Sequence, residues 1–145
     1  KPDFDEESLE QDSGLPIEES KKQNKKLILY VEDNPANLDL VKRIFTYRKD
    51  IELISAPDAL KGIELAENNQ PDLILMDIHL PGMDGLTAFK KMKEKNKTKN
   101  IPVIAVSADA MDVDKKKALN AGFVEYITKP LDITVFPEKI NQIIR

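Results

Sequence analysis

Five short apolar runs, separated by amphipathic stretches, constrain the fold of this chain more than any other feature. They span residues 27–31, 51–55, 73–76, 103–106 and 124–127. Four of the runs are almost uninterrupted in hydrophobicity, which is typical of strands buried on both faces of a parallel sheet, whereas half-exposed strands would alternate. Because such runs alternate with helical patterns, the sequence predicts a doubly wound α/β sheet of five strands and five helices.

The stretches between the runs carry helix start and stop signals. Asn34 is placed to cap the first helix, and the second is predicted over residues 58–67. The fourth helix ends at Gly122, since glycine adopts the left-handed C-cap conformation without a steric penalty. The fifth is predicted to start near Thr134, because Pro137 then falls in the first turn, where its missing N–H does no harm.

Residues 1–26 differ in composition from the rest of the chain. They hold 8 acidic and 5 basic residues and no apolar period, so we expect a linker or disordered tail. Residues 27–145 form the predicted domain, and their 18 acidic and 17 basic residues leave it almost neutral. This balance argues against nucleic-acid binding.

The residue types exclude several further classes of protein. The chain has no cysteine, which excludes disulfides, thiolate metal ligands and cysteine nucleophiles. No apolar run approaches the roughly 20 residues that cross a bilayer, so we expect no membrane contact by this segment. No signal peptide is visible, and a chain that begins at Lys1 suggests a piece of a longer polypeptide. We expect a cytoplasmic location, with membrane anchoring of the parent chain left open.

Polar residues stand just after four of the five runs. Glu32 and Asp33 follow the first run, Asp77 the third, Ser107 the fourth and Lys129 the fifth. Since ligands of open parallel sheets bind beyond the carboxyl ends of the strands, these residues should meet at one edge. Three crowded carboxylates need a counter-ion, and a few hard oxygen ligands suit Mg²⁺. A carboxylate flanked by the metal and an ammonium can attack phosphorus and hold an acyl phosphate.

Taken together and in this order, these positions resemble those of the response regulator receiver family, over residues 27–145. The resemblance rests on Glu32-Asp33, on Asp77 within LILMDIHLPGMDG, on Ser107 within VIAVSADAM, and on Tyr126 and Lys129-Pro130. It implies a flavodoxin-like (βα)5 fold with strand order 2-1-3-4-5. It also implies that the partner is a histidine kinase or a histidine phosphotransfer domain, whose phosphohistidine is the phosphodonor.

The resemblance implies how a metal ion would be held. Asp77 would be the phosphoacceptor, and Asp33 and Asp77 would ligate Mg²⁺ directly, with Mn²⁺ as the alternative ion. The backbone carbonyl of His79 would supply a further oxygen, and Glu32 would act largely through a bound water. A cis peptide bond at Lys129-Pro130 is compatible with the resemblance, although sequence does not decide between cis and trans.

The resemblance also implies a two-state switch. Lys129 would pair with the acceptor carboxylate and then with the phosphoryl group, to which Ser107 would donate a hydrogen bond. Tyr126 would turn inward as Ser107 moves. The segment 107–111 would shift, and the face of the fourth helix, fifth strand and fifth helix would change its packing and its affinity for a partner.

Each position also has an ordinary structural explanation when it is considered alone. An isolated pair such as Glu32-Asp33 is more often a solvated turn, and Tyr126 is as compatible with fixed core as with a switch. His79 is the only histidine, and we expect its side chain to point into solvent rather than to bind the metal. A sharper hypothesis is that His79 and Asp109 control the access of water to phosphorylated Asp77 and so set its lifetime.

Two other functions remain open. A phosphatase-type hydrolase with an aspartyl-phosphate intermediate would need an acid two residues after its nucleophile, where this chain has His79. A pure interaction module would be free to lose the acidic pair or the acceptor, and both are present. We expect a domain that promotes its own phosphorylation and dephosphorylation without being a turnover enzyme.

The segments SADAM and AGFVEYITKPLD resemble those of receivers at the C-terminal end of hybrid sensor histidine kinases. A free-standing single-domain regulator is the alternative context.

Overall fold

The computed structural model of the chain describes residues 25–144, and its centre is one five-stranded parallel sheet. The strands are β2 (Lys26–Val31), β3 (Ile51–Ala56), β4 (Leu73–Asp77), β5 (Val103–Ser107) and β6 (Glu125–Thr128). The helices are α3 (Pro35–Phe45), α4 (Ala59–Asn69), α5 (Gly85–Lys93), α6 (Asp112–Ala121) and α7 (Val135–Ile144). The order β3-β2-β4-β5-β6 confirms the predicted order 2-1-3-4-5.

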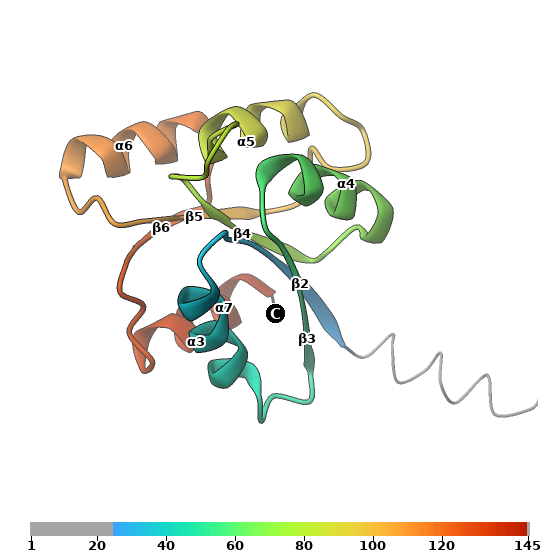
Figure 1. Cartoon of the computed structure of the whole chain (residues 1–145), viewed down its shortest axis with the longest axis vertical. Helices are drawn as coiled ribbons and strands as arrows, with labels where there is room; N and C mark the ends of the chain where they lie inside the picture. The colour runs from blue at the N-terminus through green and yellow to red at the C-terminus, as the bar shows by residue number, and fades with distance from the viewer. Residues whose placement is uncertain (1–24, 145) are drawn as a thin grey trace, which may run out of the picture.

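Helices cover both faces of the sheet: α4, α5 and α6 lie on one side, and α3 and α7 on the other (Figure 1). Because successive side chains of a strand point to opposite faces, each central strand supplies both cores. Leu29 and Val31 of β2 pack towards α4, whereas Ile28 and Tyr30 pack towards α3 and α7. β4 and β5 are buried along their whole length, which explains the unbroken apolar runs in the sequence.

The helix signals in the sequence are confirmed at most ends. The side chain of Asn34 accepts hydrogen bonds from two backbone N–H groups in the first turn of α3, and Gly122 caps α6 with φ 119°. Pro137 lies in the first turn of α7. The second helix was predicted too short: α4 continues to Asn69 and ends at Gln70, which takes the left-handed conformation (φ 46°) although it is not a glycine.

The strand ends differ from the predicted ones by one residue, and the difference matters for the site. Asp77 and Ser107 were predicted to follow their strands, but they are the last strand residues, in register with Val106 and Thr128. The last strand begins at Glu125 rather than at residue 124. Sheet hydrogen bonding therefore fixes the backbone of both residues. A position in a loop would hold their side chains less rigidly.

Most of the predicted tail, residues 1–26, lies outside the described residues. Lys26, which the composition placed in that tail, opens β2 and pairs with Ile51 of the edge strand. Its N–H also donates a hydrogen bond to the carbonyl of Asp50. Within residues 25–144, none of the helices has the length and apolar character that a membrane span requires.

Gly85 is packed against the backbone at the end of β4. A Cβ atom at this position would lie 2.3 Å from the carbonyl oxygen of Asp77 and 2.9 Å from Cα of Ile78. The N–H of Gly85 donates a 3.0 Å hydrogen bond to the carbonyl of Ile78, which closes the loop of residues 78–84. By residue type alone, Gly85 would be an ordinary turn residue, as would Pro81 and Gly82. The structure shows a close approach that only glycine permits.

We expect Gly85→Ala to lower the free energy of unfolding by about 3 kcal/mol, since backbone atoms on both sides must move to admit the methyl group. Gly82→Ala is the matched control: its Cβ would meet nothing within 4 Å, and only the positive φ of 74° opposes it. That strain should cost about 1 to 2 kcal/mol. Urea unfolding of both variants measures the difference, and equal losses would contradict the steric explanation.

Candidate functional site

The candidate site lies at the carboxyl ends of β2 and β4, where the strand order reverses. The chain leaves β2 towards β3 on one side, whereas β4 lies on the other side of β2. In open parallel sheets such a switch point leaves a crevice between the loops that follow the two strands. The residues that the sequence selected come together around this crevice.

The first component is an acidic cluster. Glu32, Asp33 and Asp77 each offer a carboxylate oxygen, and these atoms lie within 4.8 Å of one another. Glu32 and Asp77 are buried, each 3% exposed, whereas Asp33 is exposed at the mouth of the crevice. An all-oxygen donor set that is open on one side fits a hard divalent cation that keeps some of its waters. The group contains no nitrogen or sulfur ligand, which disfavours a soft transition metal.

Lys129 stands against the two buried carboxylates. Its Nζ lies 2.9 Å from Oε1 of Glu32 and 3.0 Å from Oδ2 of Asp77. The backbone N–H of Lys129 donates to the carbonyl of Ser107, and the Lys129-Pro130 peptide bond is cis. Burial alone would lower the pKa of the ammonium, but hydrogen bonds to Glu32 and Asp77 raise it above its ordinary value. Lys129 is therefore a firmly charged cation inside the site.

The two buried carboxylates are not equivalent. Burial raises the pKa of Asp77, and the neighbouring Glu32 raises it further, against the opposing effect of Lys129. Burial would also raise the pKa of Glu32, but hydrogen bonds with Lys129, Asp77 and Tyr30 together hold it below its ordinary value. Glu32 is thus the carboxylate whose charge the protein itself stabilises, while ionised Asp77 is the one that gains most from an added cation.

Sequence reasoning missed Tyr30, which it counted only as a member of an apolar run. Tyr30 is fully buried, and its hydroxyl donates a 2.8 Å hydrogen bond to Oε1 of Glu32. The N–H of Asn34 donates to the other oxygen at 3.1 Å. These contacts fix the orientation of the carboxylate. The available signal was the spacing, because residues two apart in a strand share a face and a tyrosine carries a polar tip.

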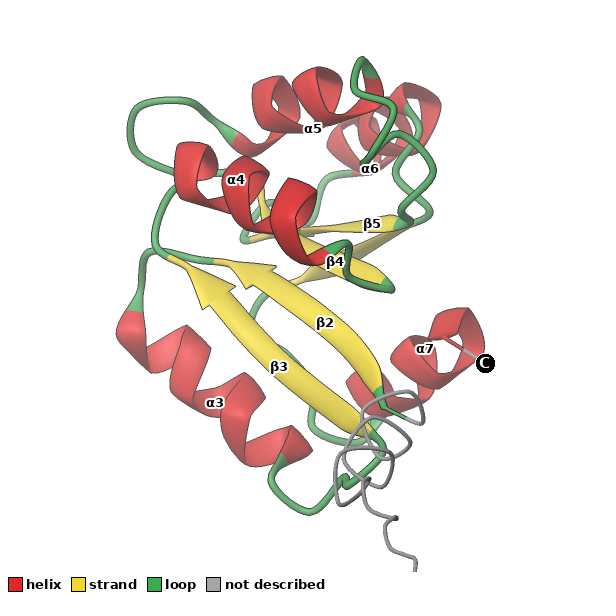
Figure 2. Cartoon of the chain, turned by 90° about the vertical axis from the view of Figure 1, so that its right-hand side faces the viewer, coloured by secondary structure: helices red, strands yellow, loops and turns green. Residues whose placement is uncertain are grey.

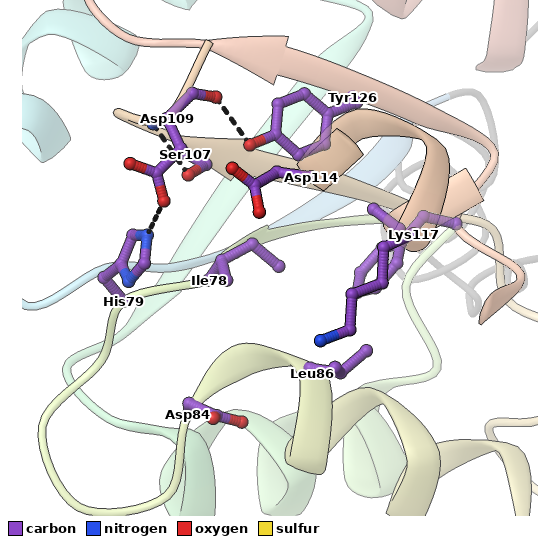
Figure 3. Close-up of a pocket in the computed structure, with 11 residues that line it drawn as sticks. Ile78, His79, Asp84, Leu86, Ser107, Asp109, Asp114, Lys117 and Tyr126 are labelled. Atoms are coloured by element: carbon purple, nitrogen blue, oxygen red, sulfur yellow. Dashed lines mark hydrogen bonds and ion pairs between the residues drawn. The ribbon is translucent and has the colours of Figure 1, made fainter. Parts of the chain in front are cut away.

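Asp109 links the remaining site residues (Figure 3). Its N–H donates to Oγ of Ser107 at 3.0 Å, and its carbonyl accepts a 2.6 Å hydrogen bond from the hydroxyl of Tyr126. Its carboxylate lies 2.9 Å from Nε2 of His79. The N–H of His79 donates in turn to Oδ1 of Asp77 at 3.0 Å. A continuous set of contacts therefore runs from the Asp77 carboxylate to the ring of Tyr126.

The structure thus brings together every residue that the sequence selected, but the contacts do not bear equally on each predicted role. The side chain of His79 is 59% exposed, as expected, and it pairs with Asp109. Tyr126 is buried with its hydroxyl bonded, which is compatible with either of its two interpretations. The roles of the His79 carbonyl as a metal ligand, and of Ser107 and Tyr126 in a switch, stay predictions.

The fold and the acidic crevice define the class of protein, namely a receiver domain of two-component signalling. The family model for the response regulator receiver domain matches residues 28–141, and the chain belongs to this family. The polar-differentiation response regulator DivK of Brucella anthropi is 38% identical over 116 residues, which cover 80% of this chain and 94% of that protein.

Two solved structures have the same fold as this chain. One is the receiver domain of the sensor histidine kinase PA1611 from Pseudomonas aeruginosa, with a magnesium ion coordinated in the active site cleft. It is 28% identical, has a TM-score of 0.75, and the match covers 83% of this chain and 98% of that one. The chemotaxis protein CheY4 of Vibrio cholerae is 18% identical with a TM-score of 0.75, over 82% and 98% of the two chains. At that identity it supports the fold alone.

Proposed function

We propose that this domain accepts a phosphoryl group on Asp77 from a phosphohistidine, in a Mg²⁺-dependent reaction, and thereby changes its affinity for a partner in a phosphorelay. The observation that carries the proposal is the surroundings of the Asp77 carboxylate. Asp77 is held by the β4–β5 ladder, with Lys129 on Oδ2 and the acidic cluster beside it. This arrangement supplies a nucleophile, a fixed positive charge and oxygen ligands within one crevice.

The chemistry of the acidic cluster supports Mg²⁺ as the cofactor. We infer that Asp33 and Asp77 hold the ion directly, with the backbone carbonyl of His79 as a further ligand and Glu32 acting through water. When bound, the ion would neutralise charge on the phosphoryl oxygens and bring them next to the acceptor. Mn²⁺ prefers the same oxygen ligands and is the alternative ion.

The chain's own residues account for the remaining requirements of the transfer. A carboxylate oxygen of Asp77 forms the new bond to phosphorus as the bond to the donor's imidazole nitrogen breaks, and the leaving ring keeps that electron pair. Lys129 can then pair with a phosphoryl oxygen. Since Oγ of Ser107 accepts from the N–H of Asp109, its own proton is free to be donated to the phosphoryl group.

The same contacts suggest how phosphorylation would be transmitted. The phosphoryl group adds a charge of about −1.5 to −2, and drawing Ser107 towards it would break the contact with the N–H of Asp109. The carbonyl of Asp109 holds Tyr126, so the segment 107–111 and the ring would rearrange together. Beyond them lies the face of α6, β6 and α7, and several large apolar side chains in or next to these elements are exposed: Met111, Val113, Val124, Ile133 and Val135. We propose that this face changes its partner affinity.

We also propose the cellular context. The partner would be a histidine kinase or a histidine phosphotransfer domain, and the parent chain a hybrid sensor histidine kinase, with a free-standing regulator as the alternative. The PA1611 structure is a receiver of a sensor histidine kinase, whereas the DivK relative is a response regulator. Because phosphohistidine donors are made from ATP, we place the domain in the cytoplasm.

Incubation of the full chain with acetyl phosphate and Mg²⁺ tests the proposed function. We expect one phosphoryl group per chain by intact-mass analysis, in a bond that hydroxylamine cleaves, as acyl phosphates require. Turnover of phosphomonoesters in a steady-state assay would instead favour the hydrolase alternative. If neither acetyl phosphate nor beryllofluoride with Mg²⁺ perturbs the amide signals around Asp77, the domain is an interaction module.

His79→Asn should accelerate dephosphorylation about tenfold. A tenfold change in rate corresponds to the free energy of about one hydrogen bond to a charged group. The reason is that the 2.9 Å contact between His79 and Asp109 joins the loops after β4 and β5 beside the acceptor. Loss of the phosphorylated species after removal of the donor gives the rate. Asp109→Asn should have the same effect, and the double variant no more than either single one. An unchanged rate in His79→Asn would remove the pair from the mechanism.

A further inference from the structure

A groove between α4 and α5 combines apolar side chains with an excess of positive charge. The residues that line it include three apolar ones and three lysines: Leu60, Ile63, Met83, Lys91, Lys95 and Lys97. Leu60 is 69% exposed, although it is a large apolar side chain. α4 and α5, whose side chains line the groove, lie on the same side of the sheet (Figure 2), whereas the proposed switch uses the face of α6, β6 and α7.

The acidic residues of the groove pair with only one of its three lysines. Glu64 pairs with Lys61 at 3.4 Å, and Glu67 pairs with Lys95 at 3.7 Å. No carboxylate among residues 25–144 forms an ion pair with Lys91 or Lys97. The three lysines of the groove belong to a segment, residues 90–99, that holds six lysines and one glutamate. The groove is therefore an exposed cationic surface with apolar side chains within it.

A second groove connects this surface to the place where the chain enters the sheet. It is lined by Asp72, Asn96, Lys97 and Ile101, among others, so that Lys97 belongs to both grooves. Asp72 is hydrogen-bonded to the start of β2. Its carboxylate accepts a 2.8 Å hydrogen bond from the N–H of Leu27, and its own N–H donates to the Leu27 carbonyl. Lys97 therefore borders both the groove beside the start of β2 and the groove between α4 and α5.

An acidic stretch of the sequence that precedes β2, residues 3–19, is complementary in charge to these grooves. Residues 3–19 hold eight acidic residues and no basic one, with Phe4, Leu9, Leu15 and Ile17 among them. Residues 20–25 separate this stretch from β2, and six extended residues span about 20 Å. A segment tethered this closely has an effective concentration in the millimolar range, so weak contacts are enough to hold it.

We propose that residues 3–19 bind in cis along the groove between α4 and α5, with their carboxylates on Lys91 and Lys97 and an apolar side chain against Leu60. Single exposed ion pairs contribute little, so the interaction depends on the summed charge and weakens as salt is added. The bound segment covers the exposed leucine.

Paramagnetic relaxation tests this proposal, because the chain has no cysteine and Ser8→Cys offers a single site for a nitroxide label. At low salt we expect the label to broaden the amide signals of α4, α5 and residues 94–100. Lys91→Glu with Lys97→Glu should abolish this broadening. Lys115→Glu with Lys116→Glu on α6 is the matched control, since it makes the same change of charge on another helix and should leave the broadening unchanged.

Two further measurements make the outcome decisive. Adding Glu6→Lys and Glu7→Lys to the Lys91→Glu, Lys97→Glu chain should restore the broadening, which a misfolded variant would not do. Mixing the labelled chain with an unlabelled ¹⁵N chain should leave the ¹⁵N signals sharp. Broadening that stays confined to residues near the start of β2, survives the charge reversal, or appears in the mixed sample would overturn binding in cis to this groove.

Discussion

Asp77→Asn should reduce phosphoryl acceptance by at least about 1,000-fold, because an amide oxygen is a far weaker nucleophile than a carboxylate. The substitution preserves the shape of a buried side chain whose backbone is fixed by the β4–β5 ladder. The loss should therefore come from chemistry rather than from folding. The rate of phosphoryl incorporation from acetyl phosphate, followed by intact-mass analysis, measures the effect.

The same variant should be more stable than the native chain when no divalent cation is present. The folded state raises the pKa of Asp77, so it binds the proton more tightly than the unfolded chain does. Stability then falls as the pH rises through this pKa, and ionised Asp77 opposes folding at neutral pH. An asparagine removes that charge. Urea unfolding in EDTA checks the sign of the change.

Asp114→Asn provides the matched control for the acceptor. Asp114 lines the pocket beside the site but is not a member of the acidic cluster, so this variant should accept phosphate at the native rate. If Asp77→Asn is phosphorylated as fast as the native chain, another residue is the acceptor and the proposed function is wrong.

Asp33→Asn should weaken Mg²⁺ binding by about 100-fold, at the upper end of what changes around a metal site commonly cost. Asp33 is well suited to this test because it is exposed and its side chain makes no hydrogen bond within the described residues. The metal-free fold should therefore be unchanged. Titration calorimetry with MgCl₂ gives the dissociation constant, and phosphorylation from acetyl phosphate should fall in parallel.

Asp39→Asn on α3 removes an equally exposed carboxylate outside the cluster and should leave Mg²⁺ affinity as it is. Equal affinities of the native chain and Asp33→Asn would mean that Asp33 is the solvated turn residue that an isolated acidic pair suggests. Residues other than Asp33 would then have to hold the Mg²⁺ beside Asp77.

Much of the fold was predictable because its signals are local. A strand buried on both faces must be apolar throughout, and this requirement identified β4 and β5 from sequence alone. Asn34 and Gly122 satisfy helix ends within a few residues of themselves, so their roles were visible too. The end of α4 was not, because Gln70 adopts a left-handed conformation that its residue type does not favour.

The candidate site was predictable for a related reason. Parallel strands place all their carboxyl ends at one edge, so Glu32, Asp33, Asp77 and Lys129 had to converge once the strands were recognised. What this reasoning leaves out is orientation. It does not say that Lys129 contacts both buried carboxylates, or that Glu32 rather than Asp77 has its pKa lowered.

By itself, the sequence determined the alternation of strands and helices, the edge at which the acidic residues gather and the family to which the chain belongs. Only the tertiary structure decided the contacts between Tyr30 and Glu32, between His79 and Asp109, and between Gly85 and the backbone of Asp77. Residue type and periodicity specify which face or end of an element a side chain occupies. Hydrogen bonds and close approaches depend on ångström-scale distances, and packing of the whole domain sets these.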